Sequence, residues 1–256
     1  MCNLANIHGT HGINDATSSG SGSGSGTIPA TARALIPTHP ACADALALAK
    51  ASLPASILYH SFRVYLYAQA FIRQDPASQS IVIGAPAPAP GHVDKAYPHV
   101  LFVACILHDV GTSSTHGDAI PERFEVVGAD VAARLLRSHG ISDGEVRDAW
   151  LAISLHTSPG IAERLGGTVR ALRLAVRADF GSYPPPPADQ IPGGADTLVN
   201  LIRWQLPRLE IEKDLGDAVV RQALLKPQKA PAASWPGDLV RAHEEDPKWN
   251  GVNKAF

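Results

Sequence analysis

The 256-residue sequence contains few cysteines, few charged residues and no long hydrophobic run. Its three cysteines (Cys2, Cys42 and Cys105) are scattered and form no CxxC spacing, which excludes a thiolate zinc site and a disulfide framework. No apolar run reaches the roughly 18 residues of a membrane span, so we expect no membrane contact. The net charge of −2 offers no basic excess, so we expect no nucleic-acid partner.

The sequence also lacks the features of a secretory signal and of β-strands. Its N-terminus has no basic region followed by an apolar core, so we predict a cytoplasmic protein. Alternation of β-branched and polar residues is nearly missing, whereas apolar residues recur at helical spacing. We therefore predict an all-α fold. The expected helices cover residues 55–74, 98–109, 122–138, 142–156, 169–179, 195–205 and 207–225.

Composition divides the chain into a tail and one domain. Asp15 to Gly26 is almost entirely Ser and Gly and has too little apolar surface to fold, so we predict a flexible tail over residues 1–30. Residues 31–256 are predicted to form a single globular helical domain with catalytic function. The Ala-Pro stretch at 85–91 is interpreted as an extended loop inside this domain, because motifs on both sides belong together.

Several polar residues occupy positions where the helical pattern requires apolar ones. A single core histidine is usually bonded to a backbone carbonyl, and a single aspartate near a helix end is usually solvated or capping. Together, however, buried carboxylates are costly unless they are paired or bind a metal. A mixed imidazole and carboxylate set suits zinc, iron or manganese. The candidate residues are His60, His108, Asp109, His156 and Asp179.

The order His60, then His108-Asp109, then Asp179 resembles the H…HD…D signature of the HD superfamily of metal-dependent hydrolases. Within it, the segments His60 to Tyr65 (HSFRVY), Leu107 to Thr112 (LHDVGT) and Arg123 to Gly128 (RFEVVG) look like the fungal cyanamide hydratase branch. The resemblance implies a helical HD domain and one divalent metal, zinc first, with iron and manganese as alternatives. It implies that His60, His108, Asp109 and Asp179 are the metal ligands.

The same resemblance implies a metal-dependent hydratase. In this hypothesis a metal-bound hydroxide attacks the carbon of a small nitrile-like molecule, for example in the conversion of cyanamide to urea. His156 is the predicted proton donor, and Thr112 or Thr157 is predicted to position the substrate. Glu125 is interpreted either as a residue that orients a ligand histidine or as an exposed first-turn glutamate. Because relatives tend to be homo-oligomers, we also expect a homo-oligomer.

Other functions remain open at the level of sequence. HD phosphohydrolases often carry a lysine soon after the HD pair, but here Gly111, Thr112 and Ser113 follow, which favours a small uncharged substrate over a nucleotide or phosphate ester. Arg63 and Arg123 remain available to bind an anion. A thiol nucleophile at Cys105 and a non-catalytic HD sensor or scaffold are the further alternatives. The segment 156–158 (His-Thr-Ser) also departs from the branch pattern His-Gln-Asp, so the substrate need not be cyanamide.

Overall fold

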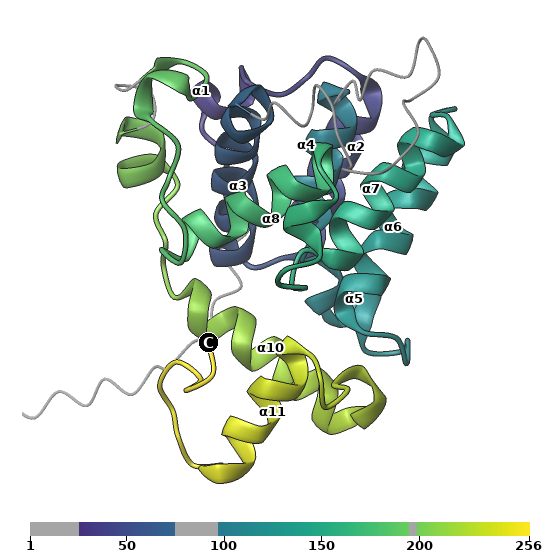
Figure 1. Cartoon of the computed structure of the whole chain (residues 1–256), viewed down its shortest axis with the longest axis vertical. Helices are drawn as coiled ribbons and strands as arrows, with labels where there is room; N and C mark the ends of the chain where they lie inside the picture. Colours follow the sequence, from purple (N-terminus) through teal and green to yellow (C-terminus); the bar gives the residue numbers. More distant parts are fainter. Residues whose placement is uncertain (1–25, 75–96, 195–198) are drawn as a thin grey trace, which may run out of the picture.

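The computed structural model describes residues 26–74, 97–194 and 199–256 (Figure 1). Every regular element in these ranges is helical and none is a strand, which confirms the predicted all-α class. Residues 1–25 of the predicted tail and the Ala-Pro stretch at 85–91 lie outside the described residues. The α-helices are α1 (Ala30–Arg33), α2 (Pro40–Ser52), α3 (Ala55–Gln74), α4 (Pro98–Leu107), α5 (Ser114–Gly117), α6 (Phe124–Ser138), α7 (Asp143–Leu155), α8 (Gly167–Asp179), α10 (Ile211–Leu225) and α11 (Trp235–Glu245).

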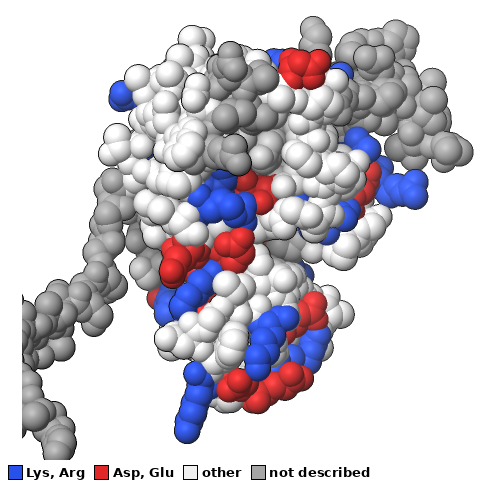
Figure 2. Space-filling model, turned by 90° about the vertical axis from the view of Figure 1, so that its left-hand side faces the viewer, with Lys and Arg blue, Asp and Glu red and all other residues white. Residues whose placement is uncertain are grey.

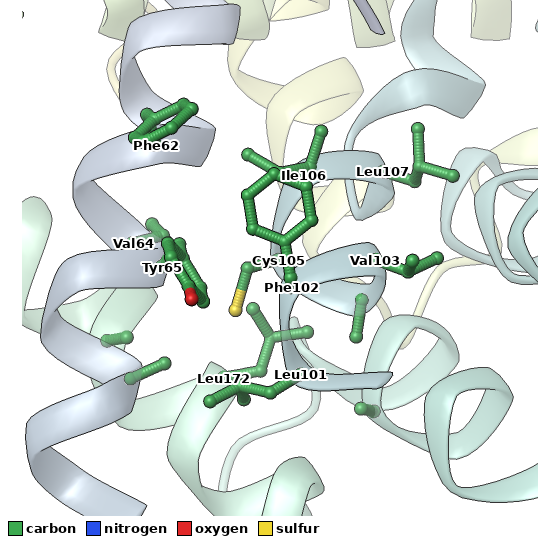
Figure 3. Packing of buried hydrophobic residues seen from close by; sticks show 14 of the residues in the cluster. Phe62, Val64, Tyr65, Leu101, Phe102, Val103, Cys105, Ile106, Leu107 and Leu172 are labelled. Carbon is green, nitrogen blue, oxygen red and sulfur yellow. The ribbon is translucent and has the colours of Figure 1, made fainter. Parts of the chain in front are cut away.

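Helix α4 is the centre of the core, as its apolar sequence predicts. Pro98 occupies its first turn, where a missing N–H costs nothing, and its residues from Val100 to Leu107 are all buried. Helices α2, α3, α6, α7 and α8 pack around it. Figure 3 shows Phe102 of α4 beside Phe62 and Tyr65 of α3, and the rings of Tyr65 and Phe102 meet edge to face at 4.8 Å. The helix predicted over residues 98–109 is therefore confirmed as far as Leu107, and it is buried.

The corner between α6 and α7 follows local rules of helix capping. Gly140 ends α6 with a φ of 71°, a left-handed conformation that glycine adopts without strain. The Ser142 hydroxyl then caps α7: it accepts a hydrogen bond from the Glu145 N–H and donates one to the Glu145 carboxylate. Gly140 and the Ser142 cap therefore determine where α7 begins. His156, the C-terminal cap of α7, is buried.

A short 3₁₀ turn, η2 (Val110–Thr112), follows the His108-Asp109 pair and lies directly against α6. A Cβ atom on Gly111 would lie 2.0 Å from the Phe124 carbonyl oxygen, and one on Gly128 would lie 3.0 Å from the His108 carbonyl oxygen. Only glycine allows the two backbones to approach this closely. The start of α6 is thereby held beside the HD pair.

Helices α10 and α11 form a separate layer beneath the helical bundle (Figure 1). The layer is attached to the bundle at two points. The Gln222 side-chain amide donates to the Gly111 carbonyl in the turn after the HD pair at 3.0 Å, and the Lys229 ammonium donates to the Glu122 carbonyl just before α6 at 2.6 Å. The helix predicted over residues 195–205 is, in its described part, a π-helical segment, η5 (Val199–Gln205). No helix in the described ranges combines the length and apolarity needed to cross a bilayer.

Candidate metal centre

The five polar residues that the helical pattern placed on inward faces converge in the interior. His60 lies in the middle of α3, His108 and Asp109 follow α4, His156 caps α7, and Asp179 is the last residue of α8. All five side chains are buried. Four of these residues come together because the C-terminal ends of α4, α7 and α8 meet beside α3.

His60, His108 and Asp109 form the tightest group. Each offers one ligand atom, and these atoms lie within 4.8 Å of one another. Nε2 of His108 lies 3.0 Å from the Asp109 carboxylate and 3.3 Å from Nε2 of His60. The fourth member of the neighbourhood is His156, whose Nε2 lies 3.5 Å from the other Asp109 oxygen.

The hydrogen bonds at Nδ1 of the three histidine rings determine whether the Nε2 atoms carry a hydrogen or a lone pair. Nδ1 of His108 lies 2.8 Å from the Cys105 carbonyl, and Nδ1 of His156 lies 2.6 Å from the Ile153 carbonyl. Nδ1 of His60 lies 2.7 Å from the Asp179 carboxylate. Because each of these oxygens accepts a hydrogen bond, Nδ1 carries the proton, and each Nε2 of a neutral ring presents a lone pair. Three lone pairs are then available to a cation beside the Asp109 carboxylate, whereas a protonated His108 would direct its Nε2 hydrogen at that carboxylate, 3.0 Å away.

The Asp109 carboxylate is buried and has no hydrogen-bond partner on either oxygen among the described residues. Burial by itself opposes its ionisation, but His108 and His156 outweigh that effect and hold the pKa of this carboxyl below its ordinary value. An ionised buried carboxylate without donors is strongly unfavourable unless a cation compensates it. Imidazole nitrogens and a carboxylate oxygen are donors that zinc, iron and manganese accept, so the residues fit a divalent metal.

Burial opposes the charged form of both His60 and His108, but the pKa of the two rings shifts in opposite directions. Burial lowers the pKa of His60 although Asp179 acts in the opposite sense, so the neutral, ligating form is favoured. For His108, burial also opposes the charge, but Asp109 outweighs it and raises the pKa. A proton and a metal therefore compete for the position beside His108 and Asp109.

Asp179, predicted as the fourth ligand, has a different set of neighbours. Its two oxygens accept from Nε and Nη2 of the buried Arg63, at 2.7 and 2.8 Å, and one of them also accepts from His60. Burial opposes its charge, but Arg63 and His60 hold the pKa of this carboxyl below its ordinary range. The carboxylate thus lies behind His60, where it fixes the tautomer and the orientation of the ring.

Arg63 is the main residue of the centre whose role the sequence analysis missed. The sequence left it available to bind an anion, but it is fully buried and forms a fork with Asp179. The available signal was its spacing, because Arg63 follows His60 by one helical turn on the inward face of α3.

The two predicted threonines are placed differently. Thr157 lines the cavity in front of the metal centre, where its hydroxyl donates to the buried carboxylate of Glu125 at 2.7 Å. Glu125 also binds Arg123 at 2.5 Å and touches no histidine of the centre. Thr112 does not line the cavity; its hydroxyl donates to the Asp109 carbonyl at 2.7 Å. Thr112 therefore shapes the turn after the HD pair.

Cys105, the alternative nucleophile, is fully buried in α4. Burial raises the pKa of its thiol, so the reactive thiolate is suppressed. The cavity in front of the metal centre has a volume of about 950 Å³, and His60, His108, Asp109 and His156 line it while Cys105 does not. The geometry therefore directs chemistry to the histidines and Asp109.

One family model matches the chain. It describes the HD domain and covers residues 57–202, which is more than half of the sequence and includes His60, the His108-Asp109 pair, His156 and Asp179. No curated protein matches the chain.

Proposed function

Because the chain belongs to the HD domain family, we propose that it is a metal-dependent enzyme that adds water to a small nitrile-like molecule. His60, His108 and Asp109 would hold the metal. The observation that carries this proposal is the buried Asp109 carboxylate, which has no hydrogen-bond partner among the described residues and lies 3.0, 3.5 and 3.7 Å from the Nε2 atoms of His108, His156 and His60. A protein that served only as a scaffold would gain stability by replacing such a carboxylate with an apolar residue.

A divalent cation bound there supplies Lewis-acid activation of a water molecule. In the proposed reaction, water adds its oxygen to the nitrile carbon and both of its hydrogens end on nitrogen, so that R–C≡N and H₂O give R–C(=O)NH₂. With cyanamide as substrate the product is urea. No oxidant, reductant or second substrate is required.

His156 is the proposed proton carrier of this reaction. Its Nδ1 hydrogen is committed to the Ile153 carbonyl, so Nε2 is the atom that can accept a proton from water and return it to the substrate nitrogen. The bond from Arg173 to the His156 carbonyl, at 2.9 Å, fixes the backbone at this position. His156 lines the cavity and is therefore in reach of a substrate.

A phosphate ester is the second candidate substrate, because Arg123, Arg173, Arg177 and Arg241 line the cavity. These guanidinium groups already have partners. Arg123 binds Glu125, Arg173 binds Glu163, Arg177 lies near Glu163, and Arg241 binds Asp238. An incoming phosphate would have to compete with these carboxylates, which favours an uncharged substrate.

The test is metal content together with activity. Wild type, Asp109→Asn and the control Asp217→Asn are purified, and metal is measured by mass spectrometry. Each protein is then assayed for urea formation from cyanamide, for amide formation from nitriles, and for phosphate release from nucleotides. Asp217 is an exposed residue paired with Lys213 and provides a matched change of charge far from the centre.

We expect near-stoichiometric metal and hydration in wild type and in Asp217→Asn, and loss of both in Asp109→Asn. Phosphate release without hydration would establish the phosphohydrolase instead. Failure of the folded wild type to retain or take up a divalent metal would refute both.

A further inference from the structure

We propose that the substrate carries an aromatic or cyclic apolar group, and that this group packs against Phe180, Trp235 and Phe256 while its reacting carbon lies beside the metal centre. This inference rests on the proposed hydration reaction and adds to it the class of substrate. All three aromatic side chains line the same cavity as His60, His108 and His156.

The first argument is the arrangement of rings. Phe180 lies 4.6 Å from the His60 ring, Phe256 lies 4.9 Å from Phe180, and Trp235 lies 5.6 Å from Phe256, measured between ring centroids. Phe124 then connects Trp235 to His156, His156 contacts His108, and His108 contacts His60 again. The aromatic wall, defined as Phe180, Trp235 and Phe256, is thus continuous with the rings of the metal centre.

The second argument is size. The cavity measures about 950 Å³, near the upper end of the roughly 300–1,000 Å³ that binds drug-sized ligands. A molecule of only a few non-hydrogen atoms, such as cyanamide, would fill a small part of it and leave the aromatic wall facing water. Apolar surface that faces water in a binding site gains free energy when a ligand covers it.

The third argument is charge at the entrance. On the face shown in Figure 2, Lys and Arg side chains lie next to Asp and Glu side chains in mixed clusters. The cavity arginines Arg123 and Arg173 are held by Glu125 and Glu163. Because these arginines already have carboxylate partners, the aromatic side chains of the cavity match an uncharged ring better than a phosphate.

The wall also lies largely outside the part of the chain that the family model matches. The match ends at residue 202, whereas Trp235 and Phe256 belong to the C-terminal layer. The HD domain supplies the metal centre, and the C-terminal layer supplies the opposite wall. Substrate choice would therefore be carried in large part by residues outside the matched HD domain.

The experiment separates binding from turnover. Benzamide and acetamide, the hydration products of benzonitrile and acetonitrile, are titrated into the full chain and followed by protein NMR, and both nitriles are assayed for hydration. Burial of a phenyl group predicts at least about tenfold tighter binding of benzamide than of acetamide. We expect Phe256→Ala and Trp235→Ala to remove this preference.

Two further variants keep the test decisive. Ala233 is an exposed residue that lines the cavity, so Ala233→Trp narrows the cavity without disturbing the core and should weaken benzamide binding more than acetamide binding. Trp204 is 74% exposed and does not line the cavity, so Trp204→Ala should leave the preference unchanged.

Equal binding of the two amides by wild type would overturn the inference, even if cyanamide is hydrated. A benzamide preference that depends on the aromatic wall, in a protein that hydrates no nitrile, would retain the wall and reject the proposed reaction.

Discussion

At the scale of single residues, the contrast between the two carboxylates determines how the centre works. Asp109 has no donor on either oxygen, whereas Asp179 receives three hydrogen bonds from His60 and Arg63. A carboxylate without donors is available to a cation, and one that is already saturated is available to orient a ligand. We therefore infer different consequences for the loss of each.

Asp109→Asn should abolish metal binding, whereas Asp179→Asn should weaken it by about 10–100-fold, as expected for a residue that orients a ligand. The measurement is a competition titration with a chromogenic chelator. Because Asp179→Asn leaves the buried Arg63 uncompensated, we also expect it to lower the free energy of unfolding by about 3 kcal/mol, so folded protein must be verified by circular dichroism.

Two other outcomes of this titration would contradict the assigned role of Asp179. If both variants lose the metal completely while they remain folded, Asp179 is a ligand, as the H…HD…D resemblance implies, and Arg63 must release it when metal binds. If Asp179→Asn binds metal as tightly as wild type, the carboxylate has no role at the centre.

The sequence predicted the residues of the centre better than their interactions. His60, His108, His156 and Asp179 were identified because each interrupts an apolar helical face, and that pattern is local. The partner of Asp179 could not be identified in this way. Arg63 lies 116 positions from Asp179, and only the packing of α3 against α8 brings them together. Local periodicity places a side chain on a face, and tertiary contact decides which atom it meets.

At the scale of elements, the position of the HD pair depends on the close approach of η2 and α6. Gly111→Ala would place a Cβ atom 2.0 Å from the Phe124 carbonyl oxygen, and a backbone atom cannot move aside as a flexible side chain would. We expect this change to cost about 3 kcal/mol or more in the free energy of unfolding. Gly144→Ala in α7 is the matched control, because a Cβ atom there meets nothing within 4 Å.

Chemical denaturation measures both effects. Gly144→Ala should be neutral or raise stability by about 0.5 kcal/mol, since alanine restricts the unfolded chain. Equal stability of Gly111→Ala and Gly144→Ala would show that η2 and α6 are not in the close contact described.

The starts of α2, α4 and α7 meet in a cluster of titratable groups away from the metal centre. The rings of His39 and His99 stack at 4.6 Å, and Nε2 of His99 lies 3.2 Å from Glu145. Burial and then the neighbouring His39 lower the pKa of His99, and Glu145 only partly opposes them. Below the unfolded value of about 6.5, the unfolded chain therefore binds more protons at His99 than the native state does.

Stability should accordingly fall as pH decreases below about 6.5, and His99→Gln should remove part of that dependence. The free energy of unfolding of both proteins is measured by denaturation at intervals from pH 7.5 to pH 5, and the two slopes are compared. An unchanged slope in His99→Gln would mean that His99 titrates alike in the folded and unfolded chain.

At the scale of the whole molecule, the helical bundle was predictable and the cavity was not. The bundle follows from the apolar run of α4 and the periodic faces packed on it, and both are visible in sequence. The cavity arises where Trp235 and Phe256 of the C-terminal layer face His60 and Phe180 of the bundle. No pattern within residues 207–256 indicates that contact, because it depends on the attachment of Gln222 to the turn after the HD pair and of Lys229 to the Glu122 carbonyl before α6.

Metal binding should stabilise the whole fold, because the ligands come from helices distant in sequence. His60 belongs to α3 and His108 ends α4, so a bound cation joins two elements that unfolding separates. A ligand that binds only the native state stabilises it by about 4 kcal/mol at a thousand times its dissociation constant. Addition of a chelator should therefore lower the Tm of metal-loaded wild type by several degrees and leave Asp109→Asn unaffected.

The difference between the Tm values with and without chelator should diminish as pH falls, since protons displace the metal from imidazole. If the chelator removes the metal and the Tm of wild type does not change, the ion binds without joining these helices, and the centre described is not its site.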